Sequence, residues 1–316
     1  GEELARAVAR ERRLSGELRF GLFYDSNVAV VPDASSDLVA TVLREDQAQP
    51  HSPGELGSLN LAYTWLKGFD WEGTVAYRFL QTYNNQLPDF NVQNHTPTVG
   101  IAYRGSLFEA PYFAGLQLTY DFITLGGDKF VQRGIATPYF SLSETPRNFT
   151  TFEGRLQVAD FFDEGNVVPQ EVRDGIYYLI GAVHFFLLEE GRHFIKGGYR
   201  FDYNATEGSN WQYAGHHFVF GVQYTLPWQE IRLRYELDFQ QRFYTHDNSL
   251  IPVEAPGTVR RRDREAIHLF SVAKDFVVMS QSFTATLEYL FDDNDSNLAP
   301  YAYTRNVVTS SLTWRF

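Results

Sequence analysis

The stretch EIRLRYELDFQ, residues 230–240, decides the fold of this chain. Apolar residues alternate in it with charged or polar ones: Ile231, Leu233, Tyr235, Leu237 and Phe239 against Arg232, Arg234, Glu236, Asp238 and Gln240. Successive side chains of a β-strand point to opposite faces, so this stretch would have one apolar face and one polar face as a strand. Helical spacing does not separate the two sets, and the period of two therefore predicts a strand.

The same alternation recurs along the chain, clearly in residues 14–25, 195–204 and 283–292. We expect about fourteen strands of roughly 10 or more residues each. They are placed near 13–25, 55–66, 71–83, 95–105, 111–124, 131–142, 149–162, 174–187, 193–204, 213–226, 230–244, 263–274, 280–292 and 303–316. The connections are expected to alternate strictly between short turns and long polar loops, with 26–54 the longest loop and 125–130 counted among the long ones.

Composition excludes several classes of protein. The 316 residues carry a formal charge of -12, which argues against nucleic acid as a partner. Without cysteine there are no disulfides and no thiolate chemistry. No uninterrupted apolar stretch approaches the roughly 20 residues of a membrane-spanning helix. Yet 16% of the residues are aromatic, more than a soluble core of this size usually requires. The rings therefore point to a membrane interface or a carbohydrate-binding surface.

Two architectures fit alternating strands, a soluble β-sandwich and a transmembrane barrel. Alternating loop lengths favour the barrel, since sandwich connections follow no such parity. Aromatic residues near strand ends fit the girdles that barrels place at lipid headgroups: Tyr63, Trp65, Trp71, Tyr112 and Trp228. We therefore predict an all-β fold, a transmembrane up-and-down antiparallel β-barrel of the bacterial outer membrane. An even strand number places both termini in the periplasm.

Residues 13–316 are expected to form this single barrel, and residues 1–12 to be a helical stub or linker from a periplasmic segment. The loop 26–54 contains apolar stretches, VAVV and LVATVL, that are unlike a free polar loop. It is expected to be a constriction or lid, with folding over the mouth from outside as the alternative.

The chain ends on alternating residues with an aromatic at the last position. This ending resembles the C-terminal signal that the barrel assembly machinery of bacterial outer membranes recognises, carried here by Val308, Leu312, Trp314 and Phe316. That machinery is therefore an expected partner.

Both ends of the barrel resemble a known family. LRFGLFYDSNVAVVPD (Leu18–Asp33) and YLFDDNDSNLAPYAYTRNVVTSSLTWRF (Tyr289–Phe316) look like the first and last strands of barrels that follow tetratricopeptide repeats, as in surface lipoprotein assembly modifiers and polysaccharide export porins. The matching positions are Tyr24, Asp25, Ser26, Asn27, Val28, Ser296, Asn297, Tyr303, Arg305, Asn306 and Phe316. The resemblance implies a barrel that passes cargo outward or helps display it, while a periplasmic recruiting domain or partner selects that cargo. No 34-residue helical repeat appears in this chain.

The polar strand faces would give the barrel a charged interior. The expected pore-lining residues are Arg19, Arg78, Arg104, Glu153, Arg155, Lys196, Arg200, Asp202, Arg232, Arg234, Glu236, Asp238, Arg242 and Glu288. Such a wall either selects solutes or is filled by interlocking salt bridges, and the sequence leaves both open. Within it, Arg232, Arg234 and Arg242 are the candidate selectivity stripe for anionic solutes.

Four arginines gather near the outer end of the expected twelfth strand: Arg260, Arg261, Arg262 and Arg264. Arginine pairs well with phosphate, so these are candidates for lipopolysaccharide contact, with a solvated loop end as the alternative.

The sequence contains no metal, nucleotide or phosphate-loop motif, so we expect no metal and no cofactor. The pairs His246–Asp247 and His216–His217 lack the context of general-base catalysis, and we expect no catalytic residues. The leading functional expectation is a translocation or export pore for a secreted polymer or surface protein, embedded in outer-membrane lipid and lipopolysaccharide. The alternatives are a passive or solute-selective porin and a structural or adhesive barrel.

Overall fold

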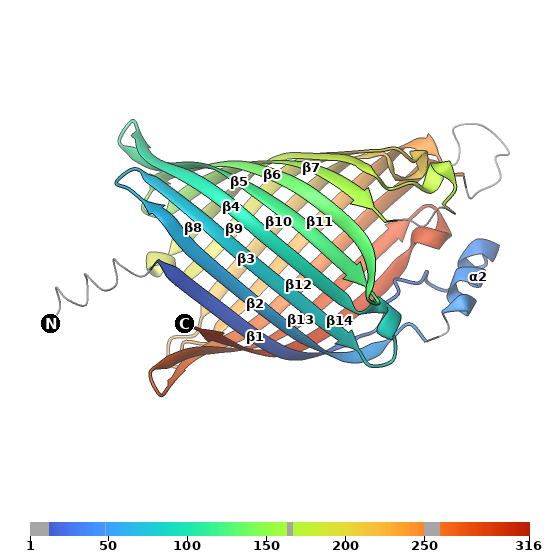
Figure 1. Ribbon diagram of the computed structural model, residues 1–316, viewed down its shortest axis with the longest axis horizontal. Coiled ribbons are helices and arrows are strands. Elements are labelled where there is room, and N and C mark those ends of the chain that lie inside the picture. The colour runs from blue at the N-terminus through green and yellow to red at the C-terminus, as the bar shows by residue number, and fades with distance from the viewer. Residues whose placement is uncertain (1–12, 48, 163–166, 250–259) are drawn as a thin grey trace.

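The computed structural model describes residues 13–47, 49–162, 167–249 and 260–316. Within these residues fourteen antiparallel strands close into one barrel, in which each strand pairs with its neighbours in the chain and β1 pairs with β14 (Figure 1). The predicted fold class and strand number are confirmed. The strands are β1 (Leu14–Asp25), β2 (Ser52–Lys67), β3 (Trp71–Asn84), β4 (Val92–Leu107), β5 (Ala110–Leu125), β6 (Asp128–Thr145), β7 (Asn148–Phe161), β8 (Gly175–Leu188), β9 (His193–Thr206), β10 (Tyr213–Thr225), β11 (Arg232–Asp247), β12 (Arg260–Val278), β13 (Gln281–Ser296) and β14 (Tyr303–Arg315).

The remaining described elements are short and lie in the connections. They are the helix α2 (Leu38–Asp46) and the 3-10 helices η1 (Pro88–Phe90), η2 (Pro169–Glu171), η3 (Glu189–Gly191), η4 (Ser209–Trp211) and η5 (Ala299–Tyr301). Among the described residues, no helix is long and apolar enough to cross a membrane. The helical stub expected at residues 1–12 lies outside the described residues.

The barrel carries its apolar side chains on the outside. Phe20, Leu22 and Ile180 are 61%, 65% and 68% exposed, although such side chains are normally withdrawn from water. By contrast, the largest fully buried side chains of the described chain are polar, among them Asp202 and Asp263. An apolar exterior around a polar interior is the arrangement of a membrane barrel, and the soluble sandwich is thereby excluded.

The two ends of the barrel differ. We call the end where β1 begins and β14 stops the turn end, and the opposite end the loop end (Figure 1). The connections at the turn end are short, and three of them have only two residues, such as Phe108–Glu109 and Met279–Ser280. Most connections at the loop end are longer, and they carry α2 and every short helix named above except η3, which lies at the turn end.

One connection at the loop end is short, so short and long connections do not alternate strictly as expected. β5 and β6 are joined by Gly126 and Gly127 alone, whereas the sequence analysis counted 125–130 as a long loop. Both glycines have positive φ, +62° and +98°. Tight hairpin turns favour such angles, and glycine reaches them without a steric penalty. The strands therefore extend up to the turn itself.

Aromatic rings form a row on the outer face near the turn end. Ring centroids are 5.0 Å apart for Trp71 and Tyr103, 6.1 Å for Tyr103 and Tyr112, and 5.3 Å for Tyr112 and Phe140. The row crosses four neighbouring strands, β3 to β6. Trp and Tyr prefer the membrane–water interface because their rings are apolar and their N–H or O–H groups are polar.

A second set of outer-face contacts joins tyrosines to histidines across neighbouring strands. The Tyr77 hydroxyl lies 2.7 Å from His95 Nδ1, the Tyr199 hydroxyl 2.7 Å from His216 Nδ1, and the Tyr235 hydroxyl 2.9 Å from His268 Nδ1. Each tyrosine hydroxyl thus has a partner, which a polar group at a lipid boundary requires. His216 therefore faces outward and is not part of the interior.

The long connection between β1 and β2 carries α2. Figure 1 shows α2 beyond the ends of the strands, so the alternative of folding outside the mouth applies. The Asp37 carboxylate caps α2 by accepting a hydrogen bond from Ala40 N at 2.9 Å. Ala40 is the only buried residue of the helix, whose other side chains are half-buried or exposed.

Candidate functional site

The barrel interior is the candidate site. Strand register determines which residues face it, because paired residues of antiparallel strands lie on the same face. Arg200 pairs with His217, His217 with Gln240 and Gln240 with Glu265, and this series of inward positions continues around the barrel. By the same register, all fourteen expected interior residues point inward: Arg19, Arg78, Arg104, Glu153, Arg155, Lys196, Arg200, Asp202, Arg232, Arg234, Glu236, Asp238, Arg242 and Glu288. That they line a conducting pore stays a prediction.

Most of these charges are paired with one another or with further charged residues. Arg19 bonds Glu288, and Lys196 bonds Glu236. Arg200 Nε lies 2.5 Å from Glu153 Oε1. Withdrawing a charge from water is costly unless an opposite charge compensates it, so pairing is what a partly filled interior requires. The sequence left open whether the charged wall selects solutes or is filled by interlocking salt bridges. At these residues the structure shows salt bridges.

The candidate selectivity stripe is neutralised in the same way. Arg232 bonds Asp275, Arg234 lies 2.5 Å from Glu236, and Arg242 lies 2.6 Å from Glu265. Each arginine therefore presents less free positive charge to a solute than its position alone suggests. The partners of Arg232 and Arg242 come from β12, which the sequence analysis did not link to the stripe.

His217 is an interior residue that was not among the expected pore-lining residues. Its Nε2 lies 3.2 Å from Asp202 Oδ1 and its Nδ1 3.4 Å from Asp238 Oδ1. The imidazole thus sits between carboxylates of β9 and β11. Strand alternation already placed it on the inner face, but the two partners come from different strands, and only the pairing of those strands identifies them.

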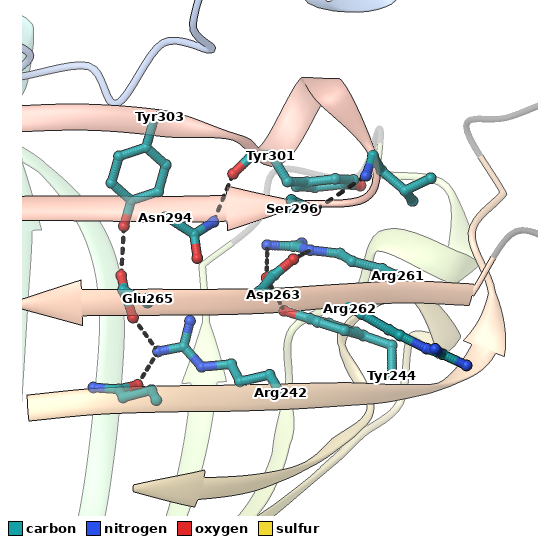
Figure 2. A network of polar contacts seen from close by, with 12 residues as sticks. Arg242, Tyr244, Arg261, Arg262, Asp263, Glu265, Asn294, Ser296, Tyr301 and Tyr303 are labelled. Atoms are coloured by element: carbon teal, nitrogen blue, oxygen red, sulfur yellow. Dashed lines mark hydrogen bonds and ion pairs between the residues drawn. The ribbon is translucent and has the colours of Figure 1, made fainter. Parts of the chain in front are cut away.

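A network at the loop end joins the barrel wall to the connections above it (Figure 2). Tyr303 donates to Glu265 at 2.6 Å, and Glu265 accepts from Arg242 at 2.6 Å. Beside this chain, Arg261 Nη2 lies 2.6 Å from Asp263 Oδ2, and the two side chains are only 8% and 0% exposed.

Arg261 also lies against aromatic rings. Its Cζ is 3.5 Å from the ring centroid of Tyr301 and 4.5 Å from that of Tyr244, with Trp211 at 5.7 Å. These rings come from η5, β11 and η4, so one guanidinium holds three separate parts of the chain. Burial raises the pKa of Tyr301, which keeps this phenol neutral.

Arg261 is therefore not available to lipopolysaccharide, and the prediction for this residue is wrong. It faces inward, because its strand alternates and the arginines beside it face outward. Arg260, Arg262 and Arg264 are exposed on the outer face at the loop end. For these three, lipopolysaccharide contact stays a prediction.

The two end motifs that carry the family resemblance meet in space. Arg305 Nη2 lies 2.5 Å from Asp25 Oδ2 across the β1–β14 seam, and Arg305 Nε bonds both oxygens of the same carboxylate. Beside this pair, Asn306 N donates to Ser26 Oγ at 2.8 Å, and Asn27 Nδ2 donates to Thr304 O at 3.2 Å. The motif residues thus close the barrel at its loop end.

The four assembly-signal residues lie on the outer face of β14 and just after it. Val308 and Leu312 are both 44% exposed. Trp314 and Phe316 have ring centroids 4.8 Å apart, and the Phe316 backbone exchanges hydrogen bonds of 3.0 Å with Gly16. A Cβ on Gly16 would lie 2.3 Å from the Phe316 ring, so the small residue makes room for the terminal aromatic. Recognition by assembly machinery stays a prediction.

The barrel interior contains two cavities of different size and lining. A cavity of about 360 Å³ opens on β6–β10, while a larger one of about 600 Å³ is lined by β1 to β5 and the end of β14. The larger cavity is lined mainly by small or uncharged side chains such as Asn60, Ala76 and Thr98. Arg78 projects into it, and within the described chain no carboxylate pairs with this exposed arginine.

The described residues hold no cluster of three or more His, Asp or Glu side chains arranged to bind a metal ion. The chemistry that the interior supports is therefore recognition by charge and hydrogen bonding.

An apolar outer surface, aromatic rows on it and a polar interior define this protein as an outer-membrane β-barrel. Residues 166–316 match the model of the family described as surface lipoprotein assembly modifier. The family resemblance of the chain ends is thus confirmed for this part of the chain, which includes the C-terminal motif. No curated protein matches the chain significantly.

Solved structures support the same architecture. In-vitro folded OmpT, an outer membrane protein of Vibrio cholerae, is 11% identical with a TM-score of 0.51, and the match covers 96% of each chain. Its loop L8 deletion mutant is also 11% identical, with a TM-score of 0.50 and coverage of 96% of this chain and 98% of that one. At this identity the likeness concerns the fold alone.

Proposed function

We propose that this barrel acts in the assembly of surface lipoproteins, by passing them through the outer membrane or helping to display them. The family match over residues 166–316 is the observation that carries the proposal. In this arrangement the turn end and both termini face the periplasm, where a recruiting domain or partner, of the tetratricopeptide type, delivers the cargo.

The geometry is compatible with that role. Ion pairs such as Arg200–Glu153 and Arg242–Glu265 reinforce the wall, whereas the larger cavity leaves space beside small side chains such as Ala76 and Thr98. The rigid part of the barrel would hold its shape in the membrane while the less filled part accommodates cargo or opens. We assign no catalytic step to the protein.

The test is deletion of the gene in its native host, followed by protease treatment of intact cells. Loss of protease-accessible lipoprotein at an unchanged total amount supports the proposal, and re-expression of the wild-type chain should restore accessibility. Unchanged surface exposure after deletion contradicts it.

The second candidate is a solute-selective porin, favoured by the cavity of about 600 Å³ and the unpaired Arg78 in it. Planar-bilayer recordings distinguish the two. A steadily open pore without any partner supports the porin, and a closed or flickering pore supports export. A structural or adhesive barrel would give no conductance and would leave lipoprotein display unchanged.

A further inference from the structure

The smaller cavity differs in charge from the rest of the molecule. It has a volume of about 360 Å³, and strands β6 to β10 form most of its lining near the loop end. Among the residues that the structure describes, its lining contains the three arginines Arg133, Arg155 and Arg173 and no acidic residue. This excess of positive charge stands out in a chain with a net charge of -12.

Arg155 is the residue that most needs a partner. Its Nη2 donates to Gln157 Oε1 at 2.7 Å, but within the described residues it forms no ion pair with a carboxylate. Its Nε is buried and has no hydrogen-bond partner. A buried charged donor without a partner is costly, and a bound anion would satisfy it.

Arg133 contributes a second incompletely used guanidinium. Its Nη2 lies 2.8 Å from Asp121 Oδ2, while its Nε is buried without a partner. The Asp121 carboxylate therefore compensates Arg133 and leaves the charge of Arg155 in excess. Guanidinium groups present several N–H donors in one plane, which suits the oxygens of carboxylate and phosphate groups.

Arg173 is held in place by aromatic rings. Its Cζ lies 4.3 Å from the ring centroid of Phe161 and 5.2 Å from that of Phe130. Stacking of this kind orients a guanidinium before any ligand arrives, so less conformational entropy is lost on binding.

The rest of the lining suits a ring bearing hydroxyl groups. Asn204 and Gln157 offer amide groups, Tyr177 and Tyr213 line the cavity while their side chains interact with Asp202, and Trp211 adds an aromatic surface. A volume of this size lies at the lower end of small-molecule sites, which range from about 300 to 1,000 Å³. It fits a single sugar ring and is far too small for a folded protein.

We propose that this cavity is a binding site for a monosaccharide-sized organic anion, a sugar bearing a carboxylate or a phosphate group. Arg155 is its central ligand, with Arg133 and Arg173 at its sides. The site is independent of lipoprotein assembly, since it is defined by a small cavity and not by a passage.

The experiment measures binding by titration calorimetry with the full chain refolded in detergent. The probes are D-glucuronate, D-glucose 6-phosphate, D-glucose and inorganic phosphate. Saturable binding of one sugar anion, at least about tenfold tighter than neutral glucose, is the expected result. The glucuronate and glucose 6-phosphate titrations decide between carboxylate and phosphate.

The variant Arg155→Gln should weaken that binding by about tenfold or more, because it removes the charge and the forked donor. Arg78→Gln is the matched control, since Arg78 also faces the interior but lines the other cavity. It should bind as the wild type does. Arg155→Lys keeps the charge without the fork and should give an intermediate affinity. Heat-dependent gel mobility verifies that each variant is folded.

Absence of saturable binding by both sugar anions overturns the proposal, as does an Arg155→Gln variant that binds as tightly as the wild type. Equal affinity for inorganic phosphate and glucose 6-phosphate overturns the assignment to a sugar. None of these measurements involves lipoprotein display, so they leave the proposed function to its own test.

Discussion

The guanidinium carbon of Arg261 lies 3.5 Å from the centre of the Tyr301 ring. This contact joins β12, where the wall ends, to η5 in the connection between β13 and β14 (Figure 2). Because Arg261 also pairs with the fully buried Asp263, the same side chain compensates a charge and anchors a loop. A solvent-exposed arginine would not hold either of these contacts firmly.

Replacing Arg261 with alanine should therefore destabilise the barrel. It leaves the buried Asp263 carboxylate with the Tyr244 hydroxyl but without an opposite charge, and breaking a buried ion pair costs about 3–5 kcal/mol in other proteins. Unfolding of the refolded protein in urea measures the loss. The control is Arg262→Ala, because Arg262 is exposed on the outer face and its removal should change stability by no more than about 0.5 kcal/mol. Equal effects of the two variants would contradict the anchoring role.

The seam pair Asp25–Arg305 should show measurable coupling in a double-mutant cycle. The Asp25 side chain is 4% exposed, so its bond to Arg305 is largely shielded from water. We expect a coupling energy of about 1–3 kcal/mol from Asp25→Asn and Arg305→Gln, measured by equilibrium unfolding.

The matched control lies on the same seam at the turn end. Glu17 and Arg315 are 2.7 Å apart but are 41% and 47% exposed. Solvent-exposed pairs contribute about 0–1 kcal/mol, so their cycle should give a smaller coupling. A larger value at Glu17–Arg315 than at Asp25–Arg305 would refute the dependence on burial.

Leu287→Arg tests which face contacts lipid. Leu287 is 53% exposed on the outer face, and arginine in the middle of the apolar band costs about 2–4 kcal/mol. Insertion into vesicles, followed by heat-dependent gel mobility, should fall. Thr286→Arg places the same side chain on the inner face of the same strand and should insert normally. Failure of Thr286→Arg alone would reverse the assignment of faces.

If the purified barrel conducts ions, Arg78 should influence its selectivity more than the three-arginine stripe does. Arg78 is exposed in the larger cavity, whereas Arg234 is paired with Glu236. Arg78→Gln should shift the reversal potential in a salt gradient toward cation preference. Arg234→Gln removes the same charge and should shift it less, because Glu236 already screens the charge of Arg234 and stays paired with Lys196 in the variant. The opposite order would show that the stripe controls permeation.

Deletion of Phe316 should reduce the amount of assembled barrel in cells and leave refolding in detergent largely intact. The reason is that the residue resembles an assembly signal, while it contacts Trp314 at the end of β14 and Gly16 at the start of β1. Quantification of heat-modifiable protein in outer-membrane fractions measures the effect. Normal assembly in cells would show that the terminal aromatic is not read as a signal.

Much of the interior was predictable, because alternation along a strand assigns each residue to a face. Glu236 and Asp238 face inward for the same reason that Leu237 faces outward. Alternation along one strand does not show, however, which residues of other strands an interior side chain contacts. Alternation placed Arg242 on the inner face but did not identify Glu265 as its partner. Arg261 was grouped with its outward-facing neighbours because the four arginines are close together in the sequence.

The sequence by itself determined the barrel, since a period of two with one apolar face leaves lipid as the surroundings of that face. Only the closed structure decided which charges compensate one another, because each pair depends on the register between strands that are separate in the chain. The charge of Arg155 is in excess for this reason: the carboxylates that neutralise other interior arginines are committed elsewhere, as Glu153 is to Arg200.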